Sequence, residues 1–147
     1  MLDYSETSLQ SRAGSRGTDA MPIDFEIDGD GIVRTRLRGS VTTAEYLSHP
    51  GSVASDPELV LPLRELFDTT AVESTEVDYA SVEAVTNPKG ATPPTLRGGR
   101  IAVLVESELT FGLGRMFQAM ARTMDFDVLV TRNRDEAERF LADHRDG

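Results

Sequence analysis

Residues 100–141 carry two kinds of hydrophobic pattern in alternation. Residues 101–105 form an unbroken apolar run, which is typical of a strand covered on both faces. From Leu109 to Met124 the apolar residues recur at spacings of three and four, which places one apolar stripe on a helix. A second strand at residues 126–130 and a final helix follow. The pattern predicts strand, helix, strand, helix, with parallel strands and right-handed crossovers.

The first patterned segment alternates with a period of two residues. In residues 23–27 isoleucine and phenylalanine alternate with acidic residues, and in residues 33–38 apolar residues and Thr35 alternate with three arginines. The sequence DGDG at residues 28–31 supplies a tight turn between them. This pattern predicts an antiparallel hairpin with one buried face. On its other face we expect ion pairs between the arginines and the acidic residues.

The sequence pattern in the middle of the chain predicts two short helices and one strand. Thr42 is followed three residues later by a glutamate, the spacing of a capping box, and the helix that begins there should be interrupted or ended by the Pro-Gly pair at 50–51. A strand marked by two leucines and Phe67 is expected to end at residues 68–70. A helix capped by Asp78 follows and stops before Asn87 and Pro88.

These elements predict an α/β domain. Its mixed five-stranded sheet has an N-terminal antiparallel hairpin followed by parallel strands, and about four helices pack on the sheet. The chain of 147 residues suits one domain. Residues 1–20 are rich in Ser, Gly and Thr and show no apolar period, so we expect a disordered tail ahead of a domain at residues 21–147.

Composition narrows the classes of function. The formal net charge of −10, with no basic cluster to offset it, disfavours binding to nucleic acid or to an anionic membrane surface. Cysteine is absent, which excludes disulfides and thiolate metal sites. No apolar run is long enough for a membrane span or a signal peptide. We therefore expect a cytoplasmic protein with no cofactor.

Four segments resemble the SpoIIAA-like proteins, a group of small bacterial proteins related to STAS domains and often labelled STAS/SEC14-like. The segments are RGSVTTAEYL, LRELFDTT, GRIAVLVESELTFGLGRMFQ and FDVLVTRNRDEAERFL, and the resemblance covers residues 22–143. It implies a SpoIIAA-like fold and a regulatory role through partner proteins. It also implies phosphorylation at Thr69 or Thr70, although this chain reads DTTAVEST where phosphorylated STAS relatives carry a short Asp-Ser-Ser/Thr-Gly-type motif.

A candidate ligand or partner surface is expected at the carboxyl edge of the sheet, where parallel sheets usually bind ligands. Three carboxylates there could hold a hard cation such as magnesium. Ser107 and Glu108 also suit the cap and the dipole of a helix start, so we expect no metal. The candidate surface consists of Asp68, Thr69, Thr70, Glu106, Ser107, Glu108, Phe111, Gly112 and Arg115.

Two glycines interrupt the apolar helix expected at residues 108–123. Each costs roughly 1 kcal/mol relative to alanine in a helix, which calls for a compensating close contact. We expect Gly114 to pack against a neighbouring element and Gly112 to border the exposed side. The methionines of this helix, with Phe111 and Phe117, are core residues or the wall of a lipid-binding cavity.

The leading interpretation is a non-enzymatic, STAS-like regulatory module that associates with a protein partner or with a second copy of itself. The alternative is a carrier that binds a small molecule or lipid in a cavity beneath the 108–123 helix. An acid-base or magnesium enzyme built on Asp68, Glu106 and Glu108 ranks third. Neither His49 nor His144 has the sequence context of a catalytic base.

Overall fold

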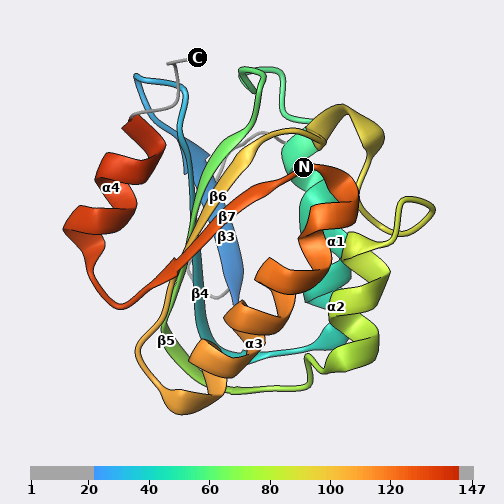
Figure 1. Cartoon of the computed structure of the whole chain (residues 1–147), viewed down its shortest axis with the longest axis vertical. Coiled ribbons are helices and arrows are strands. Elements are labelled where there is room, and N and C mark those ends of the chain that lie inside the picture. The colour runs from blue at the N-terminus through green and yellow to red at the C-terminus, as the bar shows by residue number, and fades with distance from the viewer. Residues whose placement is uncertain (1–21, 143–147) are drawn as a thin grey trace, which may run out of the picture.

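The structure is a computed structural model that describes residues 22–142. One sheet contains five strands in the order of the chain, and only the first pair is antiparallel (Figure 1). The strands are β3 (Ile23–Ile27), β4 (Val33–Val41), β5 (Arg64–Thr75), β6 (Arg100–Leu104) and β7 (Asp127–Thr131). The predicted mixed sheet is therefore confirmed. The tail expected at residues 1–20 lies outside the described residues.

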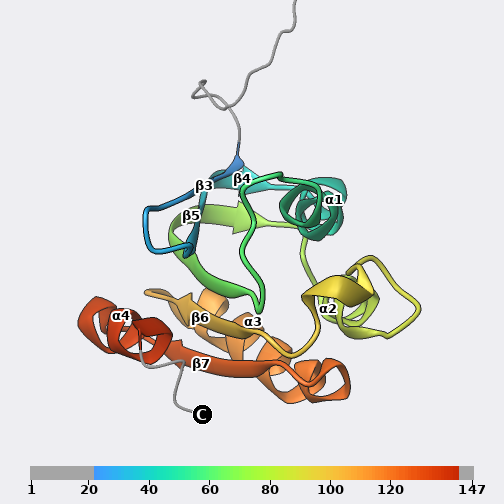
Figure 2. The same cartoon turned by 90° about the horizontal axis from the view of Figure 1, so that it is seen from above.

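Helices pack on both faces of this sheet. The helices are α1 (Thr43–Ala54), α2 (Tyr79–Thr86), α3 (Glu108–Met120) and α4 (Arg134–Ala142), with short 3-10 turns at Pro94–Leu96 and Ala121–Met124. Figure 1 shows α1, α2 and α3 on one side of the sheet and α4 on the other, and Figure 2 shows the same separation of α4 from α1 and α2 from above. Within residues 22–142, every helix is too short or too polar to cross a membrane.

Each face of the sheet has its own hydrophobic core, because successive side chains of a strand point to opposite faces. The larger core joins the sheet to α1 and α3 and contains Val33, Val53, Leu63, Val103, Val105 and Met124. The smaller core lies beneath α4 and contains Ile32, Leu66, Ala102, Leu104, Ala137 and Leu141. The larger core is the one that surrounds the candidate site.

Helix α1 begins where its capping box predicts but does not end at Pro50. The Glu45 amide donates to Thr42 Oγ1 at 3.1 Å, and the Thr42 amide donates to the Glu45 side chain at 2.8 Å. The expected interruption at residues 50–51 is wrong, because the helix continues to Ala54. A proline inside a helix removes one hydrogen bond, and burial of His49 and Val53 against the sheet offsets this loss.

Strand β5 is longer than the sequence predicts. It continues beyond residues 68–70 to Thr75, because β4 runs beside it as far as Val41 after two shifts of register. The expectation that Asp68 ends its strand is therefore wrong. Asp68 nevertheless pairs with Leu104, the last residue of β6. It therefore lies beside the carboxyl end of β6.

The ion pairs expected across the first hairpin are present. Arg38 contacts Asp24 at 2.7 Å, and Arg34 contacts Asp28 at 2.8 Å. Arg34 also binds Glu138 of α4 through both terminal nitrogens, at 2.8 and 2.9 Å. Arg34 therefore links the hairpin to α4.

Candidate functional site

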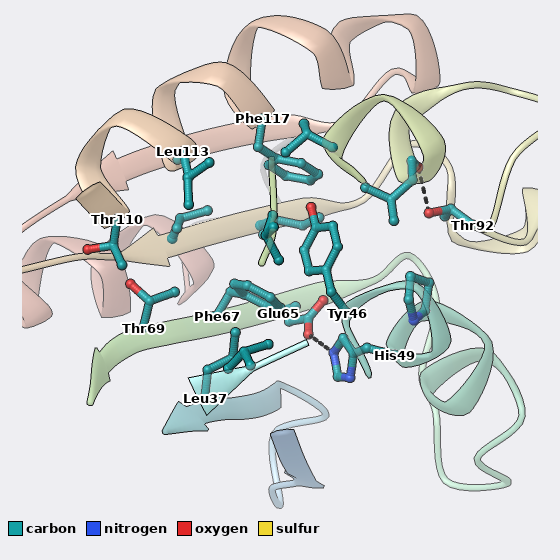
Figure 3. Close-up of a pocket in the computed structure, with 18 of the residues that line it drawn as sticks. Leu37, Tyr46, His49, Glu65, Phe67, Thr69, Thr92, Thr110, Leu113 and Phe117 are labelled. Atoms are coloured by element: carbon teal, nitrogen blue, oxygen red, sulfur yellow. Dashed lines mark hydrogen bonds and ion pairs between the residues drawn. The ribbon is translucent and has the colours of Figure 1, made fainter. Parts of the chain in front are cut away.

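A cavity lies between the sheet and the helices α1, α2 and α3, and we call it the cavity beneath α3 (Figure 3). Its volume is about 110 Å³. Hydrophobic side chains from all three helices and from the sheet form most of its wall, among them Leu37, Val53, Phe67, Val82, Val103 and Phe117. An apolar hollow with a few polar groups is the usual form of a small-molecule site.

The polar side of the cavity is built around the carboxylate of Glu65 on β5. Glu65 is only 6% exposed. Its Oε2 atom accepts a hydrogen bond from Thr35 Oγ1 at 2.5 Å and lies 2.7 Å from His49 Nε2. Because a carboxylate only accepts, this contact requires a proton on Nε2. Glu65 and His49 thus form a buried pair held in place by Thr35.

The alternation of β5 explains why a glutamate reaches this position. Leu63, Glu65 and Phe67 are two residues apart, so they face the same side, and all three line the cavity. His49 reaches the carboxylate from α1, and its ring lies between those of Phe25 and Phe67, 5.7 Å from each. These aromatic contacts fix the imidazole in its orientation toward Glu65.

Tyr46 lies one turn before His49 on α1 and also lines the cavity. Figure 3 shows its hydroxyl pointing inward, toward the α3 side of the cavity. Burial raises the pKa of Tyr46, and the nearby charge of Glu65 raises it further. The hydroxyl therefore stays protonated at any ordinary pH and can both donate and accept a hydrogen bond.

Helix α3 closes the cavity opposite Glu65 with Thr110, Leu113, Gly114 and Phe117. Of the aromatic and methionine side chains that the sequence suggested as a wall, Phe117 lines the cavity, whereas Met124 is fully buried in the core. Leu113 and Phe117 are four residues apart, so they share one face of the helix.

The structure separates the sequence-predicted surface into an inner and an outer part. Thr69 is buried, lines the cavity and donates to the Leu104 carbonyl at 2.8 Å. Asp68 is turned to the opposite face, where it accepts from the amide and the hydroxyl of Thr70 at 2.9 and 2.7 Å. Asp68 also accepts from Arg134 at 2.8 Å. The aspartate is therefore a partner of α4 and not a wall residue of the cavity.

The remaining predicted residues lie on the outer surface at the start of α3. Ser107 caps the helix by accepting from the Thr110 amide at 3.1 Å, and the exposed Glu108 contacts Arg132 at 3.3 Å. The Phe111 ring lies beneath the guanidinium groups of Arg132 and Arg115, at 4.6 and 5.7 Å. Glu106 and Gly112 are also exposed. In the described part of the chain, no group of three His, Cys, Asp or Glu residues could hold a metal ion.

The pairing of Asp68 predicts a pH-dependent contribution to stability. Burial alone would raise the pKa of Asp68, but the hydrogen bonds from Thr70 and the contact with Arg134 hold it below the ordinary 3.8. A carboxyl whose pKa is lowered by folding stabilises the fold above its unfolded pKa, and this contribution disappears as the pH falls through the folded pKa. We expect Asp68→Asn to lower the free energy of unfolding by about 1 kcal/mol at pH 7. The difference should shrink below about pH 4.

Urea denaturation of both proteins at pH 7, 4 and 3 measures this difference. Glu108→Gln is the matched control, because the Glu108 side chain is 94% exposed and a surface pair of that kind contributes little. An Asp68→Asn effect that stays constant over this pH range would contradict the assigned role of the charge.

Comparison with solved structures identifies the fold. An uncharacterized protein from the DUF3478 family, from Shewanella loihica PV-4 and with a SpoIIAA-like fold, is similar with a TM-score of 0.52. The match covers 88% of this chain and 99% of that chain at 14% sequence identity. No family model matches the sequence, and no curated protein matches it significantly. At this identity the likeness shows the fold alone, and the expected SpoIIAA-like fold is confirmed.

Proposed function

We propose that this SpoIIAA-like domain is a non-enzymatic binding module that takes a small, largely apolar molecule into the cavity beneath α3. The observation that supports the proposal is the cavity itself, which lies among three helices and the sheet and measures about 110 Å³. Apolar cavities of this order bind small hydrocarbons, since an engineered cavity of about 150 Å³ in another protein binds benzene. Ligand binding therefore ranks above the protein association that the sequence alone favoured.

The chemistry of the wall supports binding rather than catalysis. Its polar side chains are the Glu65–His49 pair, the Tyr46 hydroxyl and several threonines. Among the described residues that line the cavity there is no serine, cysteine or lysine, the groups that most often serve as covalent nucleophiles. His49 Nε2 is directed at Glu65. The polar groups of the wall are therefore suited to orient a bound molecule through hydrogen bonds.

Filling the cavity should abolish binding without affecting the rest of the helix. Leu113 lines the cavity, so Leu113→Trp places an indole in the space that a ligand would occupy. We expect wild-type protein to bind toluene saturably, with methyl NMR shifts confined to the cavity, and Leu113→Trp to show no such shifts. Leu109→Trp is the matched control, because Leu109 is on the same helix and 51% exposed. Equal binding by both variants, or none by the wild type, would overturn the proposal.

Association with a protein partner, or with a second copy of the chain, is the second candidate function. The outer side of α3 favours it, because Leu109 is exposed and the space around Gly112 is open to at least 4 Å. A helix face with a large apolar side chain and an unfilled glycine can accept the side chains of another molecule. Neither Leu109 nor Gly112 lines the cavity, so the two functions are separable by substitution.

A further inference from the structure

We infer that the molecule bound in the cavity carries one uncharged hydroxyl group, as a phenol or a small alcohol does, and that this group binds between Glu65 and Tyr46. The inference rests on the proposed function, because it specifies the chemical class of ligand for the same cavity. It goes beyond the proposed function in one respect, because a purely apolar cavity would favour a hydrocarbon over its hydroxylated analogue.

The first supporting observation is an open acceptor on a buried carboxylate. The hydrogen bond from Thr35 and the contact with His49 both end on Oε2 of Glu65. Figure 3 shows the other carboxylate oxygen directed away from His49. The Glu65 side chain is more than nine-tenths buried and lines the cavity, so a molecule in the cavity can reach this oxygen, which can only accept hydrogen bonds. A ligand that donates a hydrogen bond would supply the donor.

The second supporting observation is the Tyr46 hydroxyl, which faces the same space. Tyr46 lines the cavity, and the pKa of its phenol is raised first by burial and then by the charge of Glu65. Both groups therefore line one cavity. Because Tyr46 stays protonated, it can donate to an oxygen atom of the ligand.

A neutral hydroxyl matches these two groups better than other small polar groups. It can donate to Glu65 and accept from Tyr46 at the same time, whereas an ammonium group only donates and a carboxylate only accepts. A ligand carboxylate would also bring a second negative charge beside Glu65 in a site shielded from water. A hydrocarbon would leave both protein groups without partners.

The size of the cavity limits the apolar part of the ligand. A volume of about 110 Å³ is of the same order as the roughly 150 Å³ of an engineered cavity that binds benzene. The ligand is therefore a single small ring or a short branched chain, and a long acyl chain does not fit. Phenol and toluene are suitable probes, because they share one shape and differ only in the hydroxyl.

Calorimetric titration with phenol and toluene tests the inference on the wild type, Glu65→Leu, Tyr46→Phe and Tyr79→Phe. The measured quantity is the ratio of phenol affinity to toluene affinity. Hydrogen bonds to a charged group are the stronger kind, so we expect Glu65→Leu to lower this ratio about tenfold or more, and Tyr46→Phe to lower it severalfold. Tyr79 is 61% exposed on α2 and outside the cavity wall, so Tyr79→Phe should leave the ratio unchanged.

Each outcome of this titration has one meaning. If toluene binds but neither substitution changes the ratio, the hydroxyl assignment is overturned while the proposed function stands. If neither probe binds to the wild type, both are overturned. Tighter binding of benzoate or benzylammonium than of phenol would also overturn the assignment. Tyr46→Phe retains the Glu65–His49 pair, so the test remains decisive even if a thermal melt shows that Glu65→Leu is unfolded.

Discussion

His49→Leu is expected to lower the free energy of unfolding by about 3–5 kcal/mol, because the buried Glu65 carboxylate would lose the imidazole that binds it. The Glu65 carboxylate would keep Thr35 as its remaining hydrogen-bond donor. Both side chains of the pair are at most 8% exposed, so the carboxylate would remain largely shielded from bulk water. Urea denaturation at pH 7 measures the loss.

The double variant His49→Leu/Glu65→Leu separates the cost of the unpaired charge from the cost of altered packing. Replacing both members of a buried pair with hydrophobic residues of similar volume is often neutral or stabilising, so the double variant should recover most of the stability. The exposed pair of Arg132 and Glu108 provides the control, and Arg132→Leu should change stability by less than about 1 kcal/mol. A double variant as unstable as His49→Leu would show that packing, not charge, explains the loss.

Gly114→Leu is expected to destabilise the fold by about 1–3 kcal/mol, because α3 packs against the sheet at this glycine. A Cβ atom at this position would lie 3.0 Å from Val130 Cγ1 and 3.4 Å from Val103 Cγ1. A leucine would therefore force α3 away from the sheet. Thermal melts of the wild type and the variant measure the effect.

Gly112→Leu is the matched substitution, two residues earlier on the same helix. A Cβ atom there meets nothing within 4 Å, so we expect no loss of stability, since leucine is also the better helix former. Analytical ultracentrifugation of this variant reports on association. If Gly112→Leu destabilises the fold as much as Gly114→Leu, the close contact with Val130 is not the cause.

Local periodicity was sufficient to predict most of the fold. The alternation in residues 23–27, the apolar run around Val103 and the cap at Asp78 each depend on neighbours in the sequence, and each element is present. The different environments expected for Gly112 and Gly114 agree with the structure for the same reason, because positions on one helix follow from its geometry.

The features that were missed depend on contacts between distant segments. The sequence pattern predicts a strand end at Asp68, yet its partner Arg134 is 66 residues away in the sequence. The position of His49 beside Pro50 gives no sign of a functional role, and its pairing with Glu65 arises only when α1 packs on β5. One signal was available: Glu65 occupies the same face of its strand as Leu63 and Phe67, and a charged residue on an apolar face indicates a buried partner.

The proline inside α1 has a consequence for how a molecule enters the cavity. Pro50 lines the cavity and follows Tyr46 by four residues, so the Tyr46 carbonyl lacks the helical hydrogen bond that any other residue at position 50 could donate. The turn that carries Tyr46 and His49 therefore has one bond fewer to break when it bends, and helices bend most readily at proline. A molecule that enters the cavity past α1 would therefore meet the helix where it bends most readily, beside the polar groups of Tyr46 and His49.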